Sequence, residues 1–169
     1  RVYLSAAASL VNNELLVLSD ADETIAIGTT ADGKGNLELL INGQPHSGLA
    51  TVQASQISSI RVIGGAGSNL IDLSRVIAAD FSFVDPVTGQ PTSVYVDGGN
   101  GDDTILGSFD LNDTLFGGDG DDIINFTPVS PPSNPLNVGS TALKTSPLRA
   151  LAGTETANVI NGTDTMLFE

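Results

Sequence analysis

Short runs of apolar residues recur along the chain, separated by turns rich in Gly, Asp and Asn. Two runs flank Asn12-Asn13, Asp32-Gly33 marks a hairpin loop, and Asn42-Gly43 ends the strand before it. The remaining runs lie at 24–27, 37–41, 60–63, 94–96, 104–106 and 166–168. Runs this short between turn residues favour strands over helices, and the alternating apolar residues of 80–84 predict one more strand. We therefore expect an all-β chain in which helix is scarce.

A nine-residue pattern stands out within 96–125. Residues 98–106 read GGNGDDTIL and residues 117–125 read GGDGDDIIN, and both fit G-G-x-G-x-D-x-U-x, where U is a large aliphatic residue. Residues 108–116 keep only the second half of the pattern. On these two nonapeptides the chain resembles the RTX, or haemolysin-type calcium-binding, family. The resemblance implies a parallel β-roll in which calcium is held by Asp carboxylates and glycine carbonyls.

The chemistry of the pattern points the same way. Glycines allow sharp turns with positive φ, and calcium takes about six to eight oxygen ligands. Two nonapeptides make one full turn of such a roll, so the first and third copies should stack; Asp103 and Asp122 are 19 residues apart. We expect one calcium ion between these copies. Its expected ligands are Asp103, Asp122, Asn100 and Asp119, and the family pattern adds the carbonyls of Gly99, Gly101, Gly118 and Gly120.

Two further residues are weaker metal candidates. Residues 64–72 fit the nonapeptide with Asn69 in place of Asp, which keeps an oxygen ligand but removes its charge. Because ligand charge tunes these sites, a structural turn is favoured there over a weak calcium site. Asp113 belongs to the middle copy, which lacks the glycines and should face the opposite side. A turn with a strand is also expected at 19–27, where acidic residues precede an apolar run.

Charge narrows the classes of partner. The chain has 169 residues, a net charge of −14 and no Cys, and residues 97–122 hold eight Asp and no Lys or Arg. This charge argues against nucleic acid and against anionic membrane surfaces, and no apolar run is long enough for a membrane-spanning helix. Eight like charges so close would repel one another unless cations neutralised them. Millimolar calcium outside the cell then predicts an extracellular, secreted protein.

The sequence predicts one elongated β domain over 1–169. Its metal-binding repeats occupy 96–125, and the Pro-, Ser- and Thr-rich stretch 127–149 predicts a surface loop or an arm. A strand is expected at 158–161. Sequons place candidate glycans at Asn112, Asn125 and Asn161.

The expected fold is a parallel β-solenoid with excursion loops. The alternative is a β-sandwich with a short β-roll at 96–125. The expected function is an extracellular, calcium-stabilised structural protein, not an enzyme, because no catalytic constellation occurs in the sequence. Open solenoid ends would let copies associate head to tail into a fibre or matrix. The alternative function is a non-catalytic C-terminal calcium-folding and secretion module of a larger secreted enzyme, toxin or adhesin.

Overall fold

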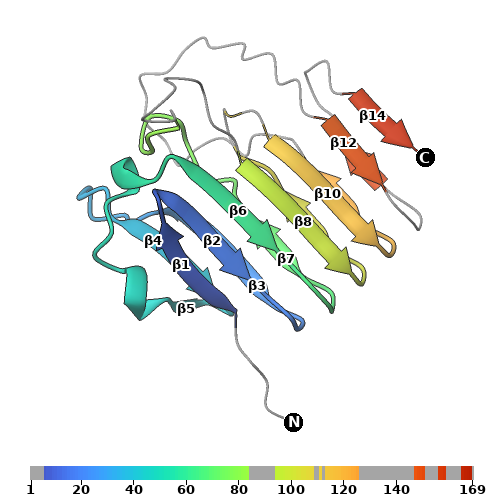
Figure 1. The fold of residues 1–169 in the computed structure, drawn as a ribbon, viewed down its shortest axis with the longest axis horizontal. Helices are drawn as coiled ribbons and strands as arrows, with labels where there is room; N and C mark the ends of the chain where they lie inside the picture. Colours follow the sequence, from blue (N-terminus) through green and yellow to red (C-terminus); the bar gives the residue numbers. More distant parts are fainter. Residues whose placement is uncertain are drawn as a thin grey trace.

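Two seven-stranded sheets face each other in the computed structural model, which describes residues 6–83, 94–108, 111, 113–125, 147–150, 156–158 and 165–168 (Figure 1). The first sheet contains, in spatial order, β1 (Ala7–Val11), β2 (Glu14–Leu18), β6 (Ser59–Ile63), β8 (Val94–Asn100), β10 (Asp113–Asp119), β12 (Pro147–Ala150) and β14 (Thr165–Phe168). The second contains β13 (Thr156–Asn158), β11 (Ile123–Asn125), β9 (Thr104–Leu106), β7 (Leu70–Asp72), β3 (Thr24–Thr29), β4 (Leu37–Ile41) and β5 (Gln44–Pro45). The helical elements of the described chain are two short 3₁₀ helices, η1 (Ser47–Leu49) and η2 (Ala54–Gln56).

Four strand–turn–strand units form the regular part of the structure. In each unit a strand of the first sheet runs into a short turn and continues as a strand of the second sheet. The units are β2 with β3, β6 with β7, β8 with β9, and β10 with β11. Equivalent strands of successive units pair in parallel. The four turns therefore lie in a row at the arrowheads of the first sheet (Figure 1).

The space between the sheets is filled by aliphatic side chains. Along β2, β4, β6 and β8, alternate residues are buried, as the two-residue period of a strand dictates. Val17, Val62, Val96 and Leu115 come from the first sheet, and Ile105 faces them from the second. Each such side chain contributes about 1.5–3 kcal/mol when it leaves water. This burial supplies the main force that holds the sheets together.

Tight hairpins turn the N-terminal strands antiparallel. Asn12 and Asn13 have φ angles of 50° and 65°, and they join β1 to β2. Asn42 and Gly43, with φ of 52° and 74°, join β4 to β5 in the same way. Two residues with positive φ make the turn that matches the twist of an antiparallel pair. A two-residue link is also too short to cross between sheets, so both strands stay in one sheet.

The parallel solenoid expected from the repeats is wrong. Both sheets are mixed, because the pairs β1–β2, β3–β4 and β4–β5 are antiparallel while the other pairs are parallel. The alternative of a β-sandwich fits in part, since two sheets face each other over one core. The physical reason lies in the hairpin turns, which add antiparallel strands beside β2 and β3, while β2 and β3 keep parallel pairs with β6 and β7.

Three expectations about single segments also differ from the structure. Residues 80–83 form no strand; Phe81 and Phe83 are buried, and their rings stack 5.3 Å apart. Most of the stretch 127–149 lies outside the described residues, but its last part belongs to β12. β13 shares only Asn158 with the strand expected at 158–161, and residues 159–161 lie outside the described residues.

Candidate metal centre

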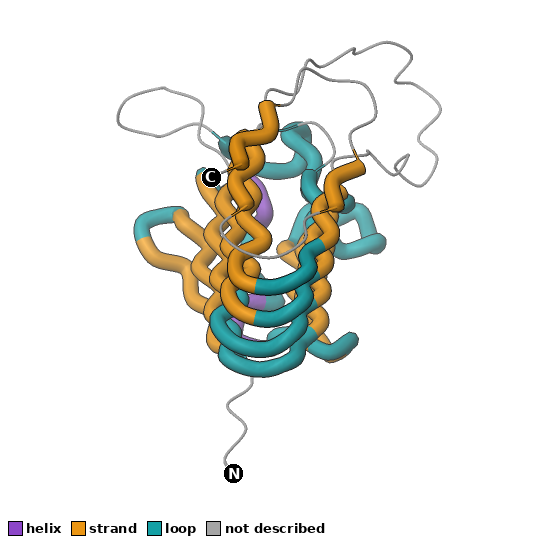
Figure 2. Tube along the Cα trace, turned by 90° about the vertical axis from the view of Figure 1, so that its right-hand side faces the viewer, coloured by secondary structure: helices purple, strands orange, loops and turns teal. Residues whose placement is uncertain are grey.

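The turn 98–103 lies between the turns 64–69 and 117–122. Figure 2 shows the turns stacked on one another. Gly99 pairs with Gly118, and Ala66 bridges to Asn100. The strands that follow continue this register, because Leu70, Thr104 and Ile123 are neighbours in the second sheet. The spacing of 19 residues between Asp103 and Asp122 therefore equals one whole unit. The structure brings together the two turns to which the sequence assigns calcium.

The eight expected ligands divide into three groups. Four glycines have positive φ and form the backbone of the turns: Gly99 (99°), Gly101 (114°), Gly118 (111°) and Gly120 (151°). Asn100 and Asp119 lie opposite each other and are exposed at the rim of the turns. Asp103 and Asp122 are buried at the ends of the turns, just before β9 and β11. An ion held inside the turns would therefore be coordinated by backbone carbonyls and buried carboxylates, not by a cluster of surface side chains.

The equivalent buried residue of each unit is Glu23, Asn69, Asp103 or Asp122, and these side chains form a ladder. Asp122 Oδ1 accepts the backbone N–H of Asp103 at 2.7 Å, and Asp103 Oδ1 accepts the N–H of Asn69 at 2.7 Å. Asn69 Oδ1 accepts the N–H of Glu23 at 3.2 Å. One oxygen of each residue thus closes a backbone gap in the preceding unit. We call this set the buried ladder.

A second ladder of side chains runs along the exposed side of the turns, one residue earlier in each unit. Asp22 Oδ1 accepts the N–H of Ser68 at 2.8 Å, Ser68 Oγ accepts the N–H of Asp102 at 3.1 Å, and Asp102 Oδ1 accepts the N–H of Asp121 at 2.9 Å. These bonds run in the opposite direction, from the following unit to the preceding one. Together the two ladders fix the stacking distance of the turns.

The second carboxylate oxygen of Asp103 is the unusual atom of the site. Asp103 is 1% exposed, and its Oδ2 is buried without a hydrogen-bond partner. This atom lies inside its own turn, where a side chain on Gly98 would overlap it. Asp122 is equally buried, and its Oδ2 lies in the corresponding place beside Gly117. A buried carboxylate oxygen without a donor costs free energy unless it is protonated or meets a cation.

Burial is the main reason that the pKa of Asp103 rises from 3.8 to about 6. The N–H bond from Asn69 lowers this pKa, and the nearby charge of Asp122 raises it further. The carboxylate is therefore destabilised by its surroundings in the protein without ligands. A divalent cation beside Asp103 and Asp122 would reverse both effects, since it replaces lost hydration and cancels the repulsion.

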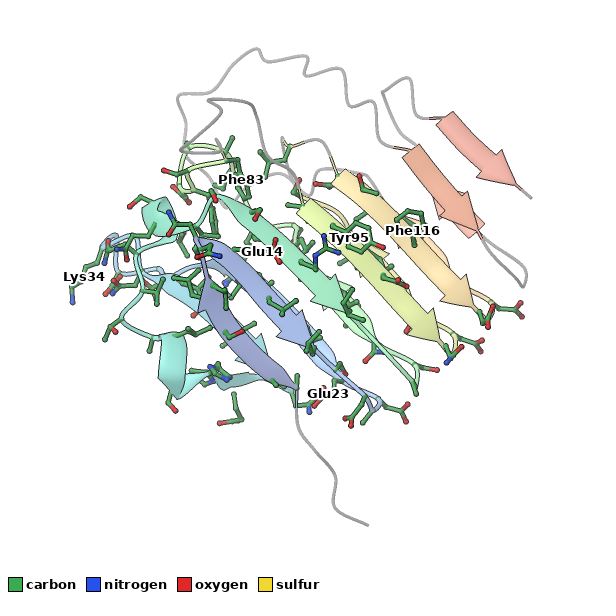
Figure 3. All side chains as sticks on the ribbon, viewed as in Figure 1. Glu14, Glu23, Lys34, Phe83, Tyr95 and Phe116 are labelled. Carbon is green, nitrogen blue, oxygen red and sulfur yellow. The ribbon has the colours of Figure 1, made fainter. Side chains whose placement is uncertain are left out.

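The basic side chains that the structure describes lie away from the turns. Lys34 pairs with Asp32, Arg75 with Glu38, and Arg61 with Glu14. Arg61 also lies over the ring of Tyr95, 4.5 Å from its centroid, and Tyr95 contacts Phe116 on the outer face of the first sheet (Figure 3). Of the basic side chains in the described ranges, none neutralises the acids of the turns by a salt bridge.

Among the described residues, no group of three or more His, Cys, Asp or Glu side chains is arranged to hold a metal ion. A cation in the turns would therefore rely on the carboxylates of Asp103 and Asp122 and on backbone carbonyl oxygens. Carbonyl and carboxylate oxygens are the ligands that calcium prefers. These oxygen ligands are of the kind that calcium prefers. A cation would also stabilise the buried Asp103 oxygen, which has no hydrogen-bond donor.

The two weaker candidates have different surroundings. Asn69 lies in the buried ladder, and its side-chain amide donates to the carbonyl oxygens of Gly67 at 2.9 Å and Gly64 at 3.4 Å. Asp113 lies at the start of β10, at the opposite ends of the strands, and accepts the N–H and the hydroxyl of Ser108 at 2.7 and 2.6 Å. Asp113 therefore fixes the connection between β9 and β10 and is not brought to the turns.

Sequence reasoning missed the place of Glu23. Its carboxylate is buried, accepts the backbone N–H of Ala6 at 2.9 Å, and accepts the hydroxyl of Ser19 at 2.6 Å. Figure 3 shows it at the same end of the molecule as the other turns. The available signal was local: Glu23 precedes Thr24-Ile25 just as Asp103 precedes Thr104-Ile105. Of the three candidate glycan positions, Asn125 ends β11, and Asn112 and Asn161 lie outside the described residues.

Comparisons with known proteins add no relative: no protein-family model, no curated protein and no solved structure matches the chain. The resemblance to the RTX family therefore rests on the nonapeptides alone. Over the part of the chain that the structure describes, no helix has both the length and the apolar character needed to cross a membrane.

Proposed function

We propose that the turns 98–103 and 117–122 bind one calcium ion, and that this ion stabilises the domain. The observation that carries the proposal is the oxygen of Asp103 that is buried without a donor beside a second buried carboxylate. Asp103 and Asp122 would supply charge, and the glycine carbonyls of the two turns would supply the remaining oxygens. The ion's chemistry here is structural, because it neutralises charge and cross-links two neighbouring turns.

Calcium suits the turns better than magnesium does. Magnesium demands near-octahedral geometry and keeps several of its waters, whereas calcium accepts irregular sets of carbonyl and carboxylate oxygens. Sites built from few charges bind calcium weakly, in the range that extracellular calcium saturates. We therefore propose an extracellular location and a structural, non-catalytic role. The alternative, a calcium-folding module of a longer secreted protein, uses the same site and predicts the same calcium response.

Self-association into a fibre or matrix is the second part of the proposal. Among the described strands, β1 and β14 end the first sheet, so each offers one edge for pairing. The edge strand β1 reads AASLV, without charge, and Val11 is 54% exposed. Uncharged edge strands are the ones that pair with other chains. A contact between β1 of one copy and β14 of another is heterologous and can therefore repeat.

Thermal unfolding tests the calcium part. Calcium added to chelator-treated protein should raise the melting temperature, and at about 100 times the dissociation constant the gain is about 2.7 kcal/mol. The double variant Asp103→Ala, Asp122→Ala should lose the response. Asp20→Asn is the control, because Asp20 is an exposed acid in the first turn of the same row, which does not adjoin the turn 98–103. An unchanged calcium response in the double variant would refute the assignment.

Electron microscopy and sedimentation at millimolar calcium test the assembly part. The expected result is fibres or a ladder of oligomers that Val11→Lys disperses, because charge on an edge strand opposes pairing. Monodisperse monomers of the unmodified chain would contradict assembly and leave the calcium site untouched.

A further inference from the structure

Asn69 occupies the same position in its turn as Asp103 occupies in the next. Both residues are buried, at 3% and 1% exposure, and both precede strands that pair in register, β7 and β9. The Oδ1 atoms also do the same work, since each accepts a backbone N–H from the preceding unit. The two turns therefore differ at one atom of this side chain: Nδ2 in Asn69 and Oδ2 in Asp103.

That atom has opposite surroundings in the two turns. Asn69 Nδ2 donates to the carbonyl oxygens of Gly67 and Gly64, which lie in its own turn. Asp103 Oδ2 has no donor. The orientation of the Asn69 amide is fixed at both of its ends, because Oδ1 needs the donor that Glu23 provides and Nδ2 needs acceptors. The carbonyl oxygens of Gly64 and Gly67 thus accept hydrogen bonds from a side-chain amide of the protein itself.

We propose that the Asn69 amide takes the place of a cation in the turn 64–69. This turn is then closed without metal. Its Asn69 N–H donates to Asp103, the first acid of the turns that we propose to bind metal. The residue at this one position decides whether a turn needs a divalent cation. The metal part of this inference rests on the proposed calcium site, whereas the amide part stands on the hydrogen bonds of Asn69.

Two reciprocal substitutions follow. Asp103→Asn keeps the oxygen that accepts from Asn69. Gly98 and Gly101 lie against Gly64 and Gly67 in the stack, so by analogy with Asn69 the new amide is expected to donate to their carbonyl oxygens. This variant should close its turn without metal. Asn69→Asp removes the donor and buries a second carboxylate without one. This variant should need a cation at a turn that previously needed none.

The experiment measures melting temperature in chelator and bound calcium per chain by equilibrium dialysis. In chelator, Asp103→Asn should melt several degrees higher than the unmodified protein and Asn69→Asp several degrees lower, where 1 kcal/mol corresponds to about 2–4 °C. With calcium, Asn69→Asp should bind one more ion per chain than the unmodified protein. Asp22→Asn is the matched control: it makes the same chemical change on an exposed acid of the turn 19–23, on the other side of the turn 64–69.

The outcomes separate this inference from the calcium proposal. A rise for Asp103→Asn no larger than the rise for Asp22→Asn would overturn the amide mechanism, because general relief of negative charge would then explain it. An Asn69→Asp variant as stable in chelator as the unmodified protein would overturn it as well. If the unmodified protein binds no calcium while both chelator shifts appear, the calcium proposal fails and the amide mechanism stands. If Asn69→Asp does not fold, Asp103→Asn still gives the decisive shift.

Discussion

The first two turns of the row and the third satisfy their buried polar groups in different ways. In the turns 19–23 and 64–69, the protein itself supplies donors: Glu23 meets Ala6 and Ser19, and the Asn69 amide meets two glycine carbonyls. In the turn 98–103, Asp103 keeps a buried oxygen without a donor. The same backbone unit therefore either closes with donors from the protein or leaves a buried carboxylate oxygen without one. The choice depends on a few atoms of one side chain.

The largest effect should come from the close stacking of the glycines. A side chain on Gly118 would overlap the carbonyl oxygen of Gly99, and its φ is 111°. Gly118→Ala should therefore separate the turns 98–103 and 117–122 and abolish the calcium response, measured by thermal unfolding with and without calcium. Gly33→Ala is the control from the other region: φ is 72°, but its added atom meets nothing within 4 Å. Gly33→Ala should lower the free energy of unfolding by about 1–2 kcal/mol, from backbone strain alone. Equal losses for Gly118→Ala and Gly33→Ala would contradict the role of stacking.

An intermediate effect should distinguish the two acids of the buried ladder. Glu23→Ala leaves the buried N–H of Ala6 without its acceptor, which costs about 1–3 kcal/mol whether or not calcium is present. Asp103→Ala should cost much more in calcium than in chelator, because only in calcium is its charge compensated. Chemical denaturation in both buffers measures the difference. A calcium-dependent cost for Glu23→Ala would contradict the contrast between the turns 19–23 and 98–103.

The smallest effect should appear as a pH dependence in chelator. The pKa of Asp103 is raised to about 6 from 3.8, so the native state binds the proton more tightly than the unfolded chain does. The associated stability is fully present below about pH 4 and is lost as the pH rises through about 6. The melting temperature of Asp103→Asn should thus exceed that of the unmodified protein by more at pH 7.5 than at pH 4.5. A gap that does not change with pH would contradict the buried, ionised Asp103.

Much of the candidate site was predictable from the sequence. The spacing of 19 residues places Asp103 next to Asp122, and the glycines with positive φ lie where the nonapeptide requires them. The hydrogen bonds of the Asn69 side chain were not predictable in the same way. Whether its amide points to glycine carbonyls depends on the orientation that the stacked turns impose, and sequence alone does not give that orientation.

Individual strands and turns of the fold were predictable from the sequence, but the prediction of a parallel solenoid was wrong. Asn12-Asn13 signalled a turn between two strands, which the structure has, and Asn42-Gly43 signalled the end of a strand, where the structure has a second hairpin. The error was to extend the parallel repeat over the N-terminal strands, where the pairs β1–β2, β3–β4 and β4–β5 are antiparallel. The alternation at 80–84 correctly signals burial of Phe81 and Phe83, but burial alone does not make a strand, because a strand also needs a free sheet edge with which to pair. Here the N–H of Ser82 bonds to Ile57 outside any ladder.

The most direct test of the calcium site is a titration of calcium into chelator-treated protein, followed by calorimetry. We predict one ion per chain for the unmodified protein, no binding for the double variant Asp103→Ala, Asp122→Ala, and unchanged binding for Asp20→Asn. Absence of binding by the unmodified protein at millimolar calcium would contradict the account, and so would full binding by the double variant.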